Sequence, residues 1–516
     1  MPRSTPIARG MFVPAAGRAG AVPRTRRTLL ALLGLVAAVA ALAAPGPAAA
    51  TSGPCIAGDS SCLDALPADG RWRQAIGLDA VPNKYQGEGL AVASIDTGVT
   101  PNANLGARLL ARADFSGEGD GLDRFGHGTH MAGLIASDGT TSLEAYEGAA
   151  PETNLVSVKV AGWDGATDVS TVIASLRWAV SHRAQYGIRV VSLSWGTDAV
   201  RGYGDDPLDL AVERAWRAGL VVVVSAGNTG PVPGTVAKPA DDPFVISVGA
   251  ADTNGTAAVA DDTVAPFSSR GPTVDGTGKP DVLAPGVSLV SDRAPGSTID
   301  SFRPAARVGA DMFKGSGTSQ AAAVVAGVAA RMLEADPGLT NDQVKGILTA
   351  TADKRLAGPA GGAGMVDARA AVAAVAAARR YGVALPPAAN AGLVPASGAG
   401  ALDASRGTER VYTDLDGDGV ADPVTGEVDA LGRPWDAAAY AAEEWSAATW
   451  AGSPWAPLVA EGAGAQPPVA SAGPVPRVAW EARYWGAASW PDAGWDARYW
   501  GARYWGARYW GTGLWQ

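Results

Sequence analysis

The sequence predicts an α/β fold: a three-layer domain with a mostly parallel central sheet and helices on both faces, followed by a low-complexity C-terminal region. Two observations carry this prediction. Within residues 86–375, short runs that are apolar throughout alternate with longer amphipathic runs, as strands buried on both faces alternate with helices in parallel sheets. The composition, 47% hydrophobic and 18% charged residues, agrees with one large globular domain plus accessory segments.

The expected elements follow in order along the chain. Apolar runs predict strands at 90–95, 155–160, 190–194, 220–224 and 244–248. Longer amphipathic runs predict helices at 128–137, 169–181, 207–218, 318–335, 340–350 and 366–378. The strands and the first helices alternate, which is the order that builds a parallel sheet with covering helices.

Residues 1–50 have the pattern of a secretory signal peptide. They contain six arginines and no acid, then the apolar run 29–44, then the small residues 48–50, so cleavage after Ala50 is expected. A membrane anchor is the alternative, but this run is shorter than the roughly 20 apolar residues of a spanning helix. The pair Arg26–Arg27 fits a twin-arginine export signal or an ordinary basic leader. The mature protein is therefore expected to be secreted, with a possible association with the cell envelope.

The charge and the cysteines restrict the possible functions. The chain has a net charge of −10, and removal of the arginine-rich leader makes it more acidic. Nucleic-acid binding is excluded, because it depends on neutralising phosphates with basic side chains. The only cysteines, Cys55 and Cys62, lie in the short segment 51–70, where they can form a local disulfide after export.

Polar side chains suited to acyl transfer stand at the ends of predicted elements. They are Asp96 after the first strand, His127 at the start of the first helix, Asn228 after the strand 220–224, and Ser319 at the start of the helix 318–335. A serine hydroxyl needs a base to take its proton, an imidazole serves at neutral pH, and a carboxylate holds that imidazole in the useful tautomer. The Asn228 amide and the Ser319 backbone N–H are suited to donate to an oxyanion. Each motif alone is common in turns and helix caps, and the combination in this order indicates a serine hydrolase.

The motifs together resemble the subtilase family, in which the triad has the same Asp, His, Ser order as in subtilisin. The similar segments are 95–98, 126–133, 225–228, 267–272, 279–286, 315–319 and 364–368. The resemblance implies a subtilisin-like catalytic domain at 71–380 that hydrolyses protein or peptide substrates without a cofactor for the chemistry. It also implies that Asp96 orients His127, that His127 acts as general base and then general acid, that Ser319 is the nucleophile, and that Asn228 stabilises the oxyanion.

Two places differ from the family pattern or add to it. The family usually has Met-Ala-Ala-Pro after the catalytic serine, and this chain has Gln320 to Ala323. Alanine is a good helix former, so we expect only a local effect on the helix start. Ser194, Trp195 and Gly196 stand where the family carries its substrate-binding strand. Trp195 either walls the pocket for the residue before the scissile bond or packs in the core.

The region after the domain is predicted to begin with a linker at 381–410, rich in Ala, Pro and Gly. In the segment 411–429 the acidic residues are spaced as in a short calcium loop, with Asp414, Asp416, Asp418 and Asp422 as candidate ligands. Thr425 stands where an EF-hand has Glu, so a complete EF-hand is not supported. A solvated acidic turn is the alternative to a structural calcium site.

From 430 to 516 the aromatic residues repeat with a period of five. They are Trp435, Tyr440, Trp445, Trp450 and Trp455, and then a tryptophan at every fifth position from Trp480 to Trp515. Five residues turn a helix by about 500°, so the rings would share no face, and extended segments or disorder are expected instead.

Because the neighbours are mainly Ala and Gly, we expect exposed rings that attach to cell-wall or polysaccharide material, or a tail without a partner. A chain ending near Arg379 should then retain activity. The rival to the enzyme is an inactive cell-envelope binding protein that acts through this tail.

Overall fold

The computed structural model describes residues 70–408, 410–413 and 422–464. The predicted signal peptide at 1–50, the segment with Cys55 and Cys62, and the second aromatic run at 480–515 lie outside these residues. Of the candidate calcium ligands, Asp414, Asp416 and Asp418 also lie outside them.

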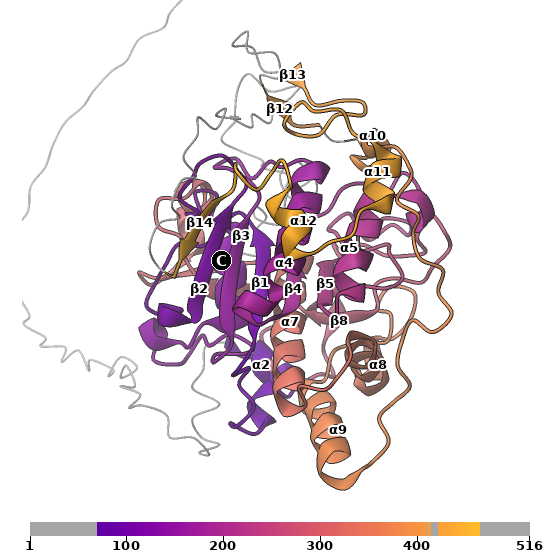
Figure 1. Cartoon of the computed structure of the whole chain (residues 1–516). Helices are drawn as coiled ribbons and strands as arrows, with labels where there is room; N and C mark the ends of the chain where they lie inside the picture. Colours follow the sequence, from indigo (N-terminus) through magenta and orange to yellow (C-terminus); the bar gives the residue numbers. More distant parts are fainter. Residues whose placement is uncertain (1–69, 409, 414–421, 465–516) are drawn as a thin grey trace, which may run out of the picture. The chain divides into compact units, whose positions relative to one another are not determined.

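A mostly parallel sheet forms the centre of the fold (Figure 1). Its strands are β1 (Ala91–Asp96), β2 (Leu109–Asp114), β3 (Asn154–Lys159), β4 (Ile188–Leu193), β5 (Val221–Ser225), β6 (Ile246–Asp252), β7 (Thr263–Val264), β8 (Val282–Pro285) and β14 (Ala460–Ala463). The order is β14-β2-β3-β1-β4-β5-β6-β7, with β8 also paired to β6, and only β14 and β7 run antiparallel to their neighbours. The sequence therefore predicted the sheet type correctly.

Helices cover the two faces of this sheet. The long helices are α3 (His127–Ala136), α4 (Val169–Tyr186), α5 (Pro207–Arg217), α7 (Thr318–Ala335), α8 (Asn341–Thr351) and α9 (Ala368–Tyr381). Helices α3 and α7 pack against each other and the sheet, while α4 and α5 form a separate packed pair. Each predicted helix is present, with ends shifted by a few residues at most sites. The three-layer prediction is confirmed.

Shorter elements connect these layers. The short helices are α2 (Trp72–Ala75), α6 (Thr298–Phe302), α10 (Leu402–Ser405), α11 (Ala437–Ala442) and α12 (Ala447–Ala451), and single turns of 3-10 helix occur at Leu78–Ala80, Gly106–Arg108, Thr140–Ser142, Tyr203–Asp205, Pro304–Ala306 and Lys354–Leu356. A second sheet joins β9 (Leu289–Asp292), β10 (Arg307–Val308) and β11 (Met312–Gly315), and a hairpin joins β12 (Tyr412–Thr413) to β13 (Asp422–Pro423).

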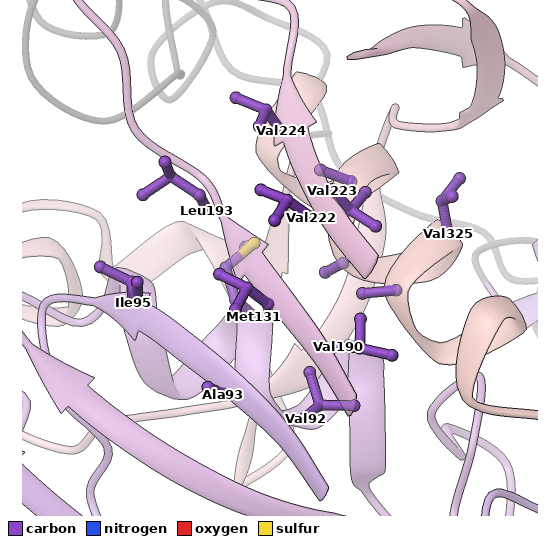
Figure 2. Packing of buried hydrophobic residues seen from close by; sticks show 14 of the residues in the cluster. Val92, Ala93, Ile95, Met131, Val190, Leu193, Val222, Val223, Val224 and Val325 are labelled. Atoms are coloured by element: carbon purple, nitrogen blue, oxygen red, sulfur yellow. The ribbon is translucent and has the colours of Figure 1, made fainter. Parts of the chain in front are cut away.

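Aliphatic side chains of the central strands fill the core. Figure 2 shows Val92 and Ile95 of β1, Val190 and Leu193 of β4, and Val222 to Val224 of β5 close to Met131 of α3 and Val325 of α7. All of these side chains are buried. Strands buried on both faces have no polar side of their own, which is why they appear in the sequence as unbroken apolar runs.

Local sequence signals fix where the helices begin and end. The Asp168 carboxylate accepts a hydrogen bond from Ser170 N at 2.9 Å and caps the start of α4, and Gly187 ends this helix with a φ of 68°. That conformation is strained for residues with a Cβ. Helix α5 begins with an Asp206 cap followed by Pro207 in the first turn. Both signals are standard for helix termini.

Residues 381–410 are not a linker, which corrects the prediction from composition. Ala396 N donates a hydrogen bond to Glu213 of α5 at 2.7 Å, and Ser397 N donates to Gly204 O at 2.8 Å. Leu402 is fully buried. Alanine and glycine are small enough to lie flat against other elements, so a composition typical of a linker also suits a segment that runs along a domain surface.

Residues 430–464 likewise belong to the folded domain and are not a tail. Strand β14 pairs antiparallel with β2 and extends the central sheet (Figure 1). Tyr440, Trp450 and Trp455 are buried, and Trp435 and Trp445 pack against the core with part of their surface exposed. The expectation of extended segments is also wrong here, because α11 and α12 are separate short helices that each carry one buried ring. The rings find partners in distant parts of the chain instead of among their sequence neighbours, since the Phe115 ring lies 6.0 Å from that of Trp450 and 6.1 Å from that of Trp455.

Among the residues that the structure describes, no helix combines the length and the apolar character needed to cross a membrane.

Candidate active site

The candidate residues gather at the carboxyl edge of the central sheet. Strand β1 ends at Asp96, and it lies between β3 and β4. In open α/β sheets, ligands bind at this edge, next to the loops that leave the strands. Helix α3 begins with His127 and helix α7 with Thr318 and Ser319, and these helices pack against each other.

Asp96 and His127 form a buried pair. The Nδ1 atom of His127 lies 2.8 Å from Oδ1 and 3.1 Å from Oδ2 of Asp96. Both side chains are almost completely excluded from solvent. A proton on Nδ1 that is held by the carboxylate leaves Nε2 as the nitrogen that exchanges protons with other groups. The geometry is that of a histidine oriented for general-base work.

Burial and hydrogen bonding have opposite effects on the pKa of the Asp96 carboxyl. Burial raises its pKa above the ordinary value, while the charge of His127 and its hydrogen bond lower the pKa in part. A hydrogen bond from Thr97 N to Oδ1 at 2.7 Å also favours the ionised form. The backbone N–H of Thr97 and the His127 ring both contact Oδ1, and these contacts hold the carboxylate against the imidazole.

A second buried carboxylate, Asp123, organises the backbone around this pair. It accepts hydrogen bonds from Thr97 Oγ1 at 2.7 Å, from Gly126 N at 2.6 Å, and from Thr129 N and Oγ1 at 2.7 and 2.8 Å. Thr97 Oγ1 in turn accepts a hydrogen bond from Gly128 N at 2.8 Å. These contacts tie the end of β1 to the first turn of α3. Sequence reasoning missed Asp123, although an acid four residues before the histidine was a usable signal.

The other histidine of the motif, His130, has a different role. Its Nε2 atom lies 3.1 Å from the backbone oxygen of Phe313. Burial, together with the nearby charge of His127, lowers its pKa to about 3. His130 therefore stays neutral over the physiological pH range and serves packing between α3 and β11, so His127 is the candidate base of the two histidines in this motif.

Ser319 lies in the first turn of α7, where backbone N–H groups and the helix dipole favour negative charge. Its Oγ lies 3.4 Å from Ser194 O, and the hydroxyl of Ser194 lies 3.4 Å from Ser319 O. The turn before the helix is fixed by a hydrogen bond from Gly317 N to Gly286 O at 2.8 Å, just after β8. The hydroxyl is thus held at the carboxyl edge of the sheet.

Asn228 follows β5 and faces the same helix start. Its Oδ1 atom accepts hydrogen bonds from Thr318 N at 2.9 Å and from Thr318 Oγ1 at 3.0 Å. Its Nδ2 group is buried and has no hydrogen-bond partner within the described part of the chain. A buried donor without a partner is costly unless a ligand satisfies it. The structure therefore leaves this amide as a free donor close to the start of α7, which carries Ser319.

The predicted substrate-binding residues lie beside Ser319, but Trp195 does not line an open pocket. The backbones of Thr197 and Lys238 exchange hydrogen bonds at 3.0 and 2.9 Å, which fixes the segment next to Gly196. Trp195 is only 2% exposed and belongs to the hydrophobic core. The structure thus favours the core alternative for this side chain.

The calcium prediction remains a prediction. Asp422, the one described candidate ligand, is exposed and pairs with Thr413 in the β12–β13 hairpin.

Comparison with known proteins gives matches to one family model and to relatives named as proteases or subtilisins. A model of the subtilase family matches residues 87–382. "Serine protease AprX" of Bacillus subtilis (strain 168) is 46% identical over 274 residues, which are 52% of this chain and 62% of that protein. "Subtilisin DY" of Bacillus licheniformis is 35% identical over 272 residues, 52% of this chain and 85% of the relative. "Subtilisin Savinase" of Lederbergia lenta is 34% identical over 286 residues, 55% of this chain and 91% of the relative.

The similarity to these proteins is confined to part of the chain. This chain spans 62% of the length of the AprX protein that it matches, and the family match ends at residue 382. A solved protease from Pseudoalteromonas arctica covers 60% of this chain and 99% of its own, with 26% identity and a TM-score of 0.49. Residues 383–464 therefore lie beyond the region that the family match covers.

Proposed function

The chain belongs to the subtilase family, and on that premise we propose that it is a secreted serine endopeptidase acting on protein or peptide substrates. The observation that carries the proposal is the buried contact of 2.8 Å between His127 Nδ1 and Asp96 Oδ1 at the sheet edge where α7 begins. A packing histidine does not need a buried carboxylate that is itself held by a backbone N–H, as Asp96 is by Thr97 N. A general base does, because its ring must stay oriented while it gains and loses a proton.

In the proposed mechanism the Ser319 hydroxyl attacks the carbonyl carbon of the scissile bond while His127 Nε2 accepts its proton. The negative charge that develops on the carbonyl oxygen is stabilised by the Asn228 amide and the backbone N–H of Ser319. Asp96 stabilises the imidazolium. His127 then gives the proton to the leaving amine, the C–N bond breaks, and water hydrolyses the acyl-enzyme with His127 again acting first as base and then as acid.

The test of this proposal is covalent labelling of the purified mature protein with a serine-directed fluorophosphonate, with the adduct mapped by mass spectrometry. We expect the adduct on Ser319. Ser319→Ala should abolish labelling and lower kcat by about 10⁶-fold, as removal of the nucleophile does in subtilisin. The fold should remain, because alanine suits a helix start.

The matched control is Ser301→Ala, which removes an exposed hydroxyl in α6. This variant should be labelled and should hydrolyse peptides like the wild type. A folded wild-type protein that carries no adduct on Ser319 would refute the enzyme and support the inactive binding protein.

Export and attachment are separate parts of the proposal. The order of charged, apolar and small residues in 1–50 supports export with removal of this segment. The tryptophans from Trp480 to Trp515 support attachment to cell-wall or polysaccharide surfaces, because flat rings bind sugar faces and repeats multiply weak contacts. A chain ending at 464 should then hydrolyse a soluble peptide like the longer chain but wash off insoluble cell-wall material. Equal retention of the two chains would disprove the attachment.

A further inference from the structure

Two loops stand on either side of Asp96 at the sheet edge. Strands β3 and β4 flank β1, and their carboxyl ends lead into the loops 160–168 and 194–206. The first loop begins beside the catalytic carboxylate, since Val160 N donates a hydrogen bond to Asp96 O at 2.9 Å. The second loop begins with Ser194, whose backbone oxygen lies 3.4 Å from Ser319 Oγ. Ligands of open α/β sheets bind outside the carboxyl ends of the strands, so a peptide bound at this edge meets these two loops.

A segment beyond the family match, residues 402–408, contacts the second loop at three points. Thr197 Oγ1 donates a hydrogen bond to Ser405 O at 3.0 Å, and Thr408 Oγ1 donates to Asp198 Oδ2 at 2.5 Å. Ser405 Oγ donates to Asp206 Oδ1 at 2.7 Å, at the cap of α5. Both the start and the end of this loop are thus held by one short stretch of chain, which we call the brace.

The brace also holds the end of the first loop through a buried ion pair. The guanidinium of Arg406 contacts the Asp168 carboxylate with Nε to Oδ2 at 2.7 Å and Nη2 to Oδ1 at 3.4 Å. Arg406 also donates to Gly426 O and Val428 O at 2.8 and 2.5 Å. Arg406 is only 2% exposed, and Asp168 caps α4 at the point where the loop ends. A planar bidentate contact of this kind fixes orientation as well as distance.

We propose that the brace, with Arg406 at its centre, is a positioning element that holds both loops for binding an extended polypeptide substrate. The inference rests on the proposed endopeptidase function. Arg406 acts through Asp168 and the loops and does not touch the reacting atoms. Its effect should therefore appear in the binding of a long substrate, which needs both loops in place, and not in attack by Ser319 on a small reagent.

The experiment compares the mature protein with two variants of the brace and with one control variant. In the double variant Arg406→Gln with Asp168→Asn, the ion pair is replaced by neutral groups, so no lone charge is left buried. The asparagine introduced by Asp168→Asn can still cap α4, because asparagine is as good an N-cap residue as aspartate. In Thr408→Val only the hydrogen bond to Asp198 is removed, at an exposed site. The matched control is Arg433→Gln, which breaks an ion pair with Asp429 whose side chains make no hydrogen bond to either loop among the described residues.

The measurements are kcat and KM for an extended peptide anilide, the rate of fluorophosphonate labelling at Ser319, and the thermal midpoint. The double variant should show a KM for the extended peptide raised about tenfold, while the labelling rate changes less than about twofold. Thr408→Val should show a smaller rise of KM, and Arg433→Gln should leave the KM unchanged.

Each other result overturns the proposal. An unchanged KM in both folded variants would mean that the brace only stabilises the fold. Equal losses of labelling and peptide hydrolysis would place the effect on the catalytic groups. If the double variant does not fold, an unchanged KM in Thr408→Val decides against the brace. Failure of the proposed function is a distinct outcome, because the wild type itself would then carry no adduct.

Discussion

Asn228 uses its side-chain oxygen to hold the turn before the nucleophile, and this use determines what its nitrogen can do. Because Oδ1 accepts two hydrogen bonds from Thr318, the amide plane is fixed, and Nδ2 has no hydrogen-bond partner among the described residues. A donor kept without a partner in the native state can interact fully with an oxygen that becomes charged during the reaction.

Asn228→Ala should therefore lower kcat with little change in KM. The expected cost is about 2.7 to 4 kcal/mol in transition-state stabilisation, roughly 10²- to 10³-fold in kcat. Steady-state kinetics on a soluble peptide measure both constants. Asn228→Asp is a second test, since it keeps the acceptor for Thr318, loses the donor and adds a negative charge where the oxyanion develops, so its kcat should fall at least as far. Near wild-type turnover in Asn228→Asp would contradict the donor role.

Asp292 makes stability depend on pH. Burial raises its pKa to about 6, although Asn104 Nδ2 and Asn102 Nδ2 donate hydrogen bonds at 2.6 and 3.1 Å and lower the pKa in part. An aspartate in the unfolded chain titrates near about pH 4. Between about pH 4 and pH 6 the folded protein thus holds a proton that the unfolded chain has lost, and the free energy of unfolding falls as pH rises.

Asp292→Asn should remove this contribution, so the variant should gain stability relative to the parent between about pH 4 and pH 7, by at most roughly 3 kcal/mol. Urea unfolding in a Ser319→Ala background, which prevents autolysis, measures it. Asp300→Asn is the control, because the pKa of Asp300 is shifted in the opposite direction from that of Asp292. Burial would raise the Asp300 pKa, but hydrogen bonds from Arg293 and Arg307 lower it below the ordinary value, and its stabilisation is lost as pH falls. A relative stability of Asp292→Asn that does not change with pH would contradict the prediction.

At the residue scale, sequence reasoning named the candidate catalytic groups and missed Asp123, which ties their backbone together. Asp96, His127, Asn228 and Ser319 stand in short motifs whose residue types the proposed reaction requires. Asp123 has no such requirement. Its role depends on hydrogen bonds that form only when the end of β1 and the start of α3 meet in space.

At the element scale, the aromatic run shows why local composition was misleading. Tyr440 packs over α5, with its hydroxyl donating to Pro207 O at 2.8 Å, and Trp450 lies with its ring 6.2 Å from His182 of α4. The residues that cover these rings lie more than 200 positions earlier in the chain. Strand β2 was missed for a related reason: its buried Arg112 and Asp114 interrupt the apolar pattern.

The hypothesis that residues 414–422 bind calcium leads to a prediction about the β12–β13 hairpin. If the spaced carboxylates of 414–422 bind calcium, a chelator should remove the ion that draws them together, and like charges should open the hairpin. Limited proteolysis of the Ser319→Ala protein should then give cleavage within 411–429 only after chelation. Asp416→Asn should give the same cleavage without a chelator. Identical digestion patterns with and without calcium would leave only an acidic turn.

At the scale of the whole molecule, the described residues between 383 and 464 complete the domain. Strand β14 covers the edge of β2, and an open edge of this kind invites pairing with other chains. Trp178 Nε1 of α4 donates to Glu461 Oε1 at 2.6 Å, and Arg214 of α5 donates to Tyr440 O at 2.9 Å. The segment therefore binds the face formed by α4 and α5 as well as the sheet edge (Figure 1).

This arrangement reverses the sequence-based expectation for truncation. Removing one buried tryptophan side chain costs about 3 to 5 kcal/mol, and loss of Trp450 and Trp455 together approaches the total stability of an ordinary domain, about 5 to 15 kcal/mol. A chain ending at 382 also loses the Arg406–Asp168 ion pair and exposes β2. We therefore expect it to unfold or aggregate, while a chain ending at 464 hydrolyses a soluble peptide as fast as the longer protein. Thermal melting and size-exclusion chromatography of the two chains measure this difference, with Trp450→Ala as an intermediate case. The prediction is wrong if the chain ending at 382 stays monomeric, melts within a few degrees of the longer chains and retains their activity. The segment 383–464 would then be dispensable, and its contacts would add little to the stability of the remaining domain.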